Sequence, residues 1–232
     1  MKKSMIILLA AAFSFSACFM INAAFSRNSA VSSGVYSQRK TLVIDAGHGG
    51  VDAGTNAADG TLEKDINLDI ALKLYDFATL SGIKAVEVRN SDAEYYPLGI
   101  DRSRSDLYNR FDFINSIDNS FLVSIHQNHF EDTSQWGMQV FYSPDDNGSK
   151  RLADGISAMN RSFLQTDNKR ENKQSDDSYY LLYNAKVPSV MVECGFMSNI
   201  EENEKLKSDD YQNKLAYIIT LGICDYLENG DV

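Results

Sequence analysis

Histidine is scarce in this sequence, and its position relative to apolar segments is informative. The 232 residues contain three histidines, His48, His126 and His129. His48 follows the apolar run TLVID within the glycine-rich motif DAGHGG, and His126 closes the run FLVSIH. Glu193 closes a third run, VMVE, where a carboxylate is costly to bury unless it is paired or used. Three chemically capable side chains therefore follow segments that predict strands.

These residue types are suited to metal-assisted hydrolysis. Two imidazoles and one carboxylate are a common ligand set for catalytic zinc, which leaves a fourth position for water or substrate. A further carboxylate can accept a proton from the attacking water. Glu63, at the start of a predicted helix, completes the required number of groups. The candidates are His48, Glu63, His126 and Glu193, and His129 replaces Glu63 as a ligand if the chain turns directly after His126.

Alternating hydrophobic patterns predict the elements that position these groups. Strands are predicted over residues 41–45, 84–89, 121–126, 138–142, 179–183 and 189–193, and helices over 62–79, 105–117, 152–163 and 211–227. A polar loop is predicted over 165–178. The alternation indicates one α/β domain with a central, at least partly parallel sheet. Ligands of such sheets bind beyond the carboxyl ends of the strands, so side chains distant in sequence can converge there.

The first 40 residues predict an export segment and a tether. Lys2 and Lys3 precede an uncharged apolar stretch, so residues 1–25 are expected to be a signal peptide or an N-terminal membrane anchor. Lipidation at Cys18 is a third alternative. Residues 26–40 are rich in serine and predict a flexible tether to a domain over 41–232. Each alternative places that domain outside the cytoplasm.

Charge and cysteine content exclude several classes of protein. The formal net charge is −10, and it becomes −12 without residues 1–25, so a nucleic acid is not an expected partner. Outside the leader, Cys194 and Cys224 lack the spacing of a metal site and are interpreted as buried free thiols. The composition is that of a globular domain.

Four segments carry a family resemblance. In order, they are LVIDAGHGGVDAGT, LEKDINLDIALKL, SIHQN and VPSVMVECGFMSN. Together they resemble the zinc-dependent N-acetylmuramoyl-L-alanine amidases of the amidase-3 type, over about residues 40–228. The resemblance implies a twisted, mixed, mostly parallel sheet flanked by helices. It also implies one Zn²⁺ per chain, held by His48, Glu63 and His126, with Glu193 as general base.

The implied reaction is hydrolysis of the amide between N-acetylmuramic acid and the L-alanine of the peptidoglycan stem peptide. Asn128 of SIHQN is a candidate substrate contact, and so is Arg170, whose guanidinium matches a stem-peptide carboxylate. Two positions depart from the family pattern: Ala46 replaces a common proline, and His129 stands where a small residue is usual. The second departure leaves open a modified zinc shell or rim.

Further segments, RSRSDLYNRFDFIN, WGMQVFY and KRENKQSDDSYYLL, resemble the small CwlD-like spore-cortex amidases. This implies a role in spore-cortex maturation, in which muramic δ-lactam formation is required for later germination. Alternatives are a vegetative autolysin of the same chemistry, a zinc deacetylase or peptidase acting on the same polymer, and a degenerate domain that binds wall or a partner. Expected partners are peptidoglycan and an activator or membrane lipoprotein. Membrane contact is expected only through the N-terminal segment.

Overall fold

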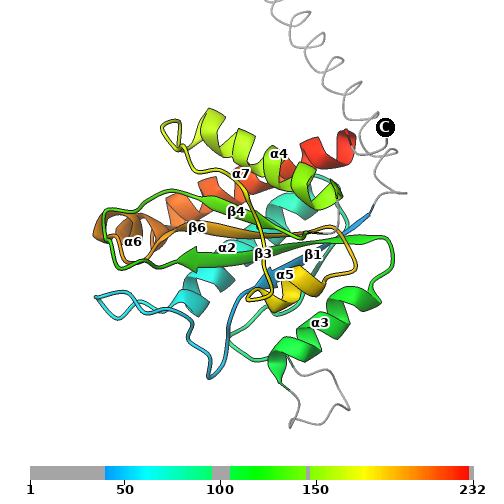
Figure 1. Ribbon diagram of the computed structural model, residues 1–232, viewed down its shortest axis with the longest axis horizontal. Coiled ribbons are helices and arrows are strands. Elements are labelled where there is room, and N and C mark those ends of the chain that lie inside the picture. The colour runs from blue at the N-terminus through cyan, green and yellow to red at the C-terminus, as the bar shows by residue number, and fades with distance from the viewer. Residues whose placement is uncertain (1–39, 96–104, 145–146, 230–232) are drawn as a thin grey trace, which may run out of the picture. The chain divides into compact units, whose positions relative to one another are not determined.

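A computed structural model describes residues 40–95, 105–144 and 147–229 of the chain (Figure 1). The predicted export segment, residues 1–25, and all but the last residue of the predicted tether lie outside these ranges. The strands within them are β1 (Thr41–Ala46), β2 (Ala85–Glu87), β3 (Ser120–Asn128), β4 (Gln139–Tyr142), β5 (Lys173–Gln174) and β6 (Ser189–Phe196). The helices are α2 (Glu63–Leu80), α3 (Asp106–Ser116), α4 (Asn147–Phe163), α5 (Tyr180–Asn184), α6 (Ile200–Leu206) and α7 (Asp209–Glu228).

The strands form one mixed, mostly parallel sheet in the order β2-β1-β3-β6-β4-β5. β2, β1, β3 and β6 are parallel, whereas β4 is antiparallel to β6 and parallel to β5. The fold class expected from the sequence is therefore confirmed. Because the four parallel strands end at the same edge, the turns that follow β1 and β3 lie close together.

Helices cover both faces of the sheet, which explains why its central strands are apolar throughout. α2, α4 and α7 lie on one face, and α3 and α5 lie on the other (Figure 1). On the α3 face, Ile114 packs with Val43 of β1 and Leu122 of β3 in a buried cluster. Within the described ranges, no helix combines the length and apolar character needed to cross a membrane.

One predicted strand is wrong. Residues 179–183 were expected to be extended, but the structure places helix α5 there. Asp176 forms a local turn, in which its side chain accepts the backbone N–H of Ser178 and its carbonyl accepts that of Tyr179. The ring of Tyr180 then packs against Tyr108 of α3 at a centroid distance of 5.1 Å. Tertiary packing thus outweighs the preference of tyrosine for strands.

Two other expectations need correction. β3 continues to Asn128 and β6 continues to Phe196, so His126 and Glu193 lie within strands and do not terminate them. The predicted polar loop over 165–178 contains the short strand β5, and its side chains at Gln165 and Asn168 are buried. Those two amides bind the backbone of Met138, which fixes the segment against β4. The other predicted helices agree with the structure to within a few residues.

Candidate active site

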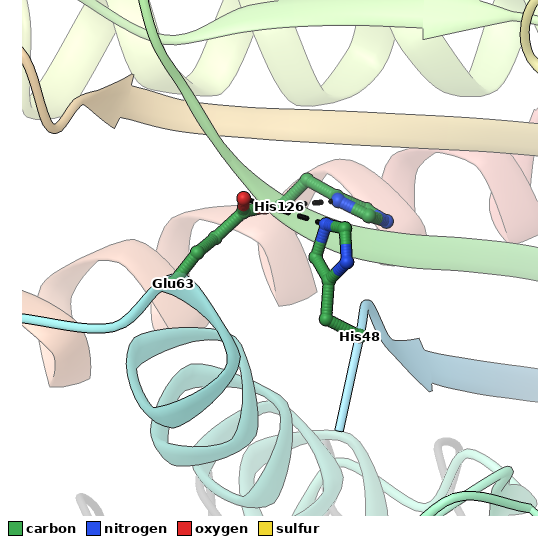
Figure 2. Close-up of side chains that lie close together, drawn as sticks. All are labelled: His48, Glu63 and His126. Carbon is green, nitrogen blue, oxygen red and sulfur yellow. Dashed lines mark hydrogen bonds and ion pairs between the residues drawn. The ribbon is translucent and has the colours of Figure 1, made fainter. Parts of the chain in front are cut away.

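The structure brings His48, Glu63 and His126 together at the carboxyl edge of the sheet (Figure 2). His48 lies in the turn after β1, Glu63 is the first residue of α2, and His126 lies in β3. One ligand atom from each residue lies within 4.8 Å of the other two. The two imidazole rings are edge to face, with centroids 5.0 Å apart.

The turn that carries His48 has a strained backbone. His48 has a φ of 61°, in the left-handed region that non-glycine residues seldom adopt. Such a residue costs roughly 1–3 kcal/mol and persists where the surrounding structure holds it. Gly49 and Gly50 also have positive φ, at 136° and 57°. The glycines of DAGHGG therefore let the chain reverse sharply enough to aim the imidazole back at Glu63.

Two buried arginines hold this turn by its carbonyl groups. Arg110 of α3 donates to the carbonyl oxygens of Ala46, at 2.8 Å, and His48, at 2.6 Å. Arg89 donates to the carbonyl oxygens of Ala46, at 2.8 Å, and Gly47, at 3.0 Å. Three successive carbonyls are thus fixed by guanidinium groups, which offer several donors in a rigid plane.

Asp45 balances part of this buried positive charge. Its carboxylate accepts from Arg110 at 2.8 Å and from the hydroxyl of Ser124 at 2.9 Å. Burial alone raises the pKa of Asp45, but the Arg110 guanidinium and the Ser124 hydroxyl lower it, and the pKa remains below its ordinary value. Asp45 therefore stays ionised beneath the turn.

Glu63 is a buried carboxylate held in place by backbone groups. One oxygen accepts the backbone N–H of Thr55 at 2.9 Å, and the other accepts that of Gln127 at 3.1 Å and the amide of Asn67 at 3.2 Å. His126 Nδ1 lies 3.0 Å from this second oxygen. Burial raises the pKa of Glu63, but the two imidazoles hold it well below the ordinary range. The carboxylate is anionic and preorganised.

His48 is oriented by a carboxylate on its other side. Its Nδ1 lies 2.8 Å from Asp52 Oδ2, and its Nε2 lies 3.4 Å from Glu63 Oε2. Burial lowers the pKa of His48, but the contacts with Glu63 and Asp52 raise it to about 9. A carboxylate partner on one ring nitrogen is typical of metal-ligating histidines, because it leaves the other nitrogen free to bind.

The donor set and its spacing fit zinc. With bonds of about 2.0–2.1 Å, tetrahedral ligands lie about 3.3–3.4 Å apart. The 3.4 Å between His48 Nε2 and Glu63 Oε2 agrees with this separation. Gly54 makes room for both side chains, since a Cβ there would lie 2.6 Å from the His48 ring and 2.7 Å from Glu63 Oε2.

Glu193 lies beside this group but is not one of its three members. The parallel register of β3 and β6 pairs Glu193 with His126. Glu193 is 8% exposed, and its Oε2 has no hydrogen-bond partner among the described residues. Burial raises the pKa of Glu193 to about 7. A carboxyl group that titrates near neutrality is suited to accept a proton and then return it.

The remaining candidates lie outside the metal-ligand group. His129 is exposed, and Asn128 is half-buried after a register shift in β3. Arg170 donates to the carbonyl of Trp136 at 2.7 Å and lies 4.3 Å from the ring centroid of Phe196. Neither Cys194 nor Cys224 forms a disulfide within the described ranges. Cys194 is buried as expected, whereas Cys224 is only half-buried.

Several supporting residues were not identified from the sequence. Asp52 follows His48 by four positions in HGGVD, a spacing that would have pointed to it. Asn67 and Gln127 form a buried amide pair under Glu63, with Gln127 Nε2 donating to Asn67 Oδ1 at 3.1 Å. Neither their types nor their spacing distinguishes them from surface amides in the sequence.

Comparison with known proteins now identifies the family. Residues 42–225 match the Amidase_3 family, described as N-acetylmuramoyl-L-alanine amidase. The chain belongs to this amidase family. The amidase is 31% identical over 197 residues to the germination-specific N-acetylmuramoyl-L-alanine amidase of Bacillus subtilis (strain 168). The matched region covers 83% of this chain and 82% of that protein.

Solved structures support the same assignment. The CwlD amidase from Clostridioides difficile, in complex with the GerS lipoprotein, is 38% identical with a TM-score of 0.76, covering 82% of the amidase and 99% of that chain. AmiC2 of Nostoc punctiforme is 29% identical with a TM-score of 0.70, covering 82% and 98%. The expected enzyme class is confirmed: this is an N-acetylmuramoyl-L-alanine amidase that acts on peptidoglycan.

Proposed function

We propose that the amidase is zinc-dependent, with one Zn²⁺ held by His48, Glu63 and His126, and that Glu193 is its proton acceptor. The observation that carries the proposal is the buried Glu193 carboxyl group, which is paired in register with His126 and has an unpartnered Oε2. Two imidazoles and one carboxylate converge next to it. This division of roles accounts for all four groups.

The reaction breaks the C–N bond between the lactyl carbonyl of N-acetylmuramic acid and the nitrogen of L-alanine. When bound, zinc supplies a Lewis acid that polarises the carbonyl and favours ionisation of water. Glu193 takes a proton from the attacking water and returns it to the nitrogen of the leaving L-alanine. The products are a free lactyl carboxylate and a stem peptide with a free amino terminus. Asp52 holds a proton on Nδ1 of His48, so Nε2 is the nitrogen that would bind the metal.

The substitution Glu193→Gln tests this assignment. It keeps the size of the side chain but removes its basicity, so we expect one equivalent of zinc to remain bound and turnover of muropeptides to be lost. Glu201→Gln, at an exposed position of α6, is the matched control and should retain full activity. Undiminished turnover by the Glu193→Gln protein would refute the assigned role.

The products separate this reaction from other zinc hydrolases that act on the same polymer. An amidase releases whole stem peptides and leaves glycan with free lactyl carboxyl groups. A deacetylase leaves the stem peptides attached, and a peptidase shortens them. Mass analysis of digested peptidoglycan therefore distinguishes the three activities. If zinc-loaded protein shows no turnover either alone or with partner proteins, the degenerate binding domain becomes the better explanation.

Asn128 and Arg170 are our proposed substrate contacts. Asn128 lies two residues after His126 at the end of β3, on the carboxyl edge of the sheet. Arg170 lies over Phe196, the last residue of β6. Replacing either side chain should raise KM more than it lowers kcat, because neither belongs to the metal-ligand group.

The proposed biological role is spore-cortex maturation, in which cleavage precedes muramic δ-lactam formation and later germination. It is supported by the germination-specific amidase and the CwlD amidase among the similar proteins. Spores that lack this amidase should contain no muramic δ-lactam and should germinate poorly, and the Glu193→Gln protein should not restore them. If the amidase were a vegetative autolysin, its loss would instead impair wall turnover in growing cells.

We also propose export through residues 1–25, with residues 26–40 as a tether, and an activator or membrane lipoprotein as partner. The uncharged apolar stretch after Lys2 and Lys3 supports export, and the GerS lipoprotein bound to the similar CwlD amidase supports the partner. Mass spectrometry of the exported protein distinguishes cleavage and lipidation at Cys18 from an intact anchor. Recovery of the amidase alone after mild crosslinking would count against a partner.

A further inference from the structure

Basic residues gather in one segment of this acidic protein. Between Lys150 and Lys173 the chain has six basic residues and three acidic ones, although its formal net charge is −10. This segment comprises most of α4 and the chain that leads into β5. Such a local excess of positive charge attracts anions that the rest of the surface repels.

Two neighbouring surface cavities lie against this segment. The first, of about 530 Å³, is bounded by Gln135 and Trp136 before β4 and by Lys169 and Arg170 before β5. The second, of about 400 Å³, is lined by Lys150 and Arg161 of α4 and again by Lys169 and Arg170. The linings also contain three acidic residues, Asp167 in the first cavity and Asp154 and Glu171 in the second. Because two residues line both cavities, the cavities form a continuous depression.

This depression begins next to the strand that carries Glu193. The guanidinium of Arg170 stacks on the ring of Phe196 at 4.3 Å, and Phe196 follows Glu193 by three residues in β6. Arg170 also donates to Gln135 Oε1 at 2.7 Å, so its position is fixed from two sides. The basic surface therefore begins three residues beyond Glu193 along β6.

Some of the cations along this depression are available to a ligand. Lys150 is paired with Asp154 at 2.6 Å. Arg161 and Lys169 are exposed, and within the described ranges neither forms an ion pair or a hydrogen bond through its side chain. In a protein with excess acidic groups, cations that line a cavity without a carboxylate partner favour binding of an external anion.

We propose that a cation strip, formed by Arg161, Lys169 and Arg170, binds the carboxylates of the stem peptide. The inference rests on the proposed function, because it places the leaving stem peptide beyond Glu193. Before cleavage the lactyl carboxyl group is part of the scissile amide, so the free carboxylates of the substrate belong to its peptide. The strip therefore makes the amidase prefer stem peptides with free carboxylates over those whose carboxylates are amidated.

The test compares two muropeptides that differ in carboxylate amidation, using zinc-loaded full-length protein. We expect the wild type to show a KM about 2- to 30-fold lower for the free-carboxylate substrate, the range given by two exposed ion pairs. In the double variant Arg161→Gln/Lys169→Gln, the preference should fall to the part that Arg170 alone supplies. The preference should also weaken with added salt, since the charges are exposed.

A matched variant removes two cations elsewhere. Lys84→Gln/Lys186→Gln changes the charge equally, at exposed positions before β2 and β6 on the opposite edge of the sheet, and should keep the wild-type preference. An undiminished preference in the Arg161→Gln/Lys169→Gln protein overturns the proposal. The proposal is also overturned if the wild type shows no carboxylate preference but is inhibited by polyphosphate, and this inhibition needs both Arg161 and Lys169. The strip would then bind phosphate-rich polymers. Failure of the wild type to cleave either substrate would count instead against the proposed function.

Discussion

The absence of a side chain at Gly47 provides the space that the imidazole of His126 occupies. A Cβ at position 47 would lie 2.2 Å from both Cε1 and Nε2 of His126. The imidazole cannot move aside freely, because its Nδ1 is 3.0 Å from Glu63, which is itself buried and held by backbone groups. The glycine of the first turn therefore determines the position of a side chain on the neighbouring strand.

We predict that Gly47→Ala displaces the His126 ring and lowers activity by about 100-fold, as expected for a misplacement of about 1 Å at a catalytic centre. Zinc affinity, measured by competition with a chelator, should fall as well. Gly60→Ala is the control: its φ is +87°, but nothing lies within 4 Å of the added Cβ. That variant should lose some stability and keep its zinc. Equal zinc affinities in the two variants would contradict the prediction.

Asp52→Asn tests how the orientation of His48 affects metal binding. The amide retains an oxygen for the backbone N–H of Gly54, 3.0 Å away in the native protein, but it lacks the charge that holds the proton on His48 Nδ1. We expect zinc affinity to fall by about 10- to 100-fold. Asp69→Asn, at an exposed position of α2, should leave the affinity unchanged. Metal titrations of both variants measure the difference.

Arg110→Met should strongly destabilise the fold, because it leaves Asp45 buried without its cation. Removing one partner of a buried ion pair costs about 3–5 kcal/mol. The lowered pKa of Asp45 gives a pH signature. In the native protein its contribution to stability is present above its ordinary pKa and is lost as the pH falls through the folded value.

In the Arg110→Met variant Asp45 remains buried but loses the guanidinium that lowers its pKa, so the pKa of Asp45 should rise. Protonation then relieves the unpaired charge, and the difference in unfolding free energy between variant and wild type should shrink from pH 7 towards pH 4. Urea unfolding across this range measures it. Arg110→Lys, which keeps the charge, should lose less stability. A difference that is constant with pH would show that lost packing, not charge, is responsible.

Removal of zinc should reveal that Glu193 destabilises the fold. Burial raises the pKa of Glu193 to about 7. A carboxyl group whose pKa is raised in the folded state makes the fold less stable as the pH rises from the ordinary pKa towards the folded-state pKa. Metal-free Glu193→Gln should therefore be more stable than the metal-free wild type at pH 8, by roughly 1–3 kcal/mol, and about equal to it at pH 5. Urea unfolding at both pH values tests this, and equal stability at pH 8 would be the contrary result.

Much of the candidate site could be predicted from the sequence because its residues follow strong local patterns. The buried run of β1 and the stripe of α2 placed His48 and Glu63 at the ends of elements that share one edge of the sheet. The run FLVSIH placed His126 in the same way. In each case hydrophobic periodicity decides the element, and the carboxyl-edge rule for α/β sheets supplies the convergence.

The remainder could not be predicted because it depends on packing between distant elements. Arg110 resembles a surface residue of α3 until the fold brings it against the carbonyls of Ala46 and His48. The tyrosines of α5 have strand preferences that packing on α3 overrides. β5 contains only Lys173 and Gln174, which is too short to leave a periodic signal.

The position of Glu193 in the strand order has a consequence for when hydrolysis begins. β6 is inserted between β3 and β4, yet it is the last strand in the sequence. A chain that emerges from its N-terminus presents His48, Glu63 and His126 long before Glu193, and the centre of the sheet stays open until β6 arrives. With Glu193 as the proposed proton acceptor, a partly emerged chain lacks the group that takes the proton from water. On this proposal, the order of the elements keeps the amidase inactive until almost all of the chain has emerged.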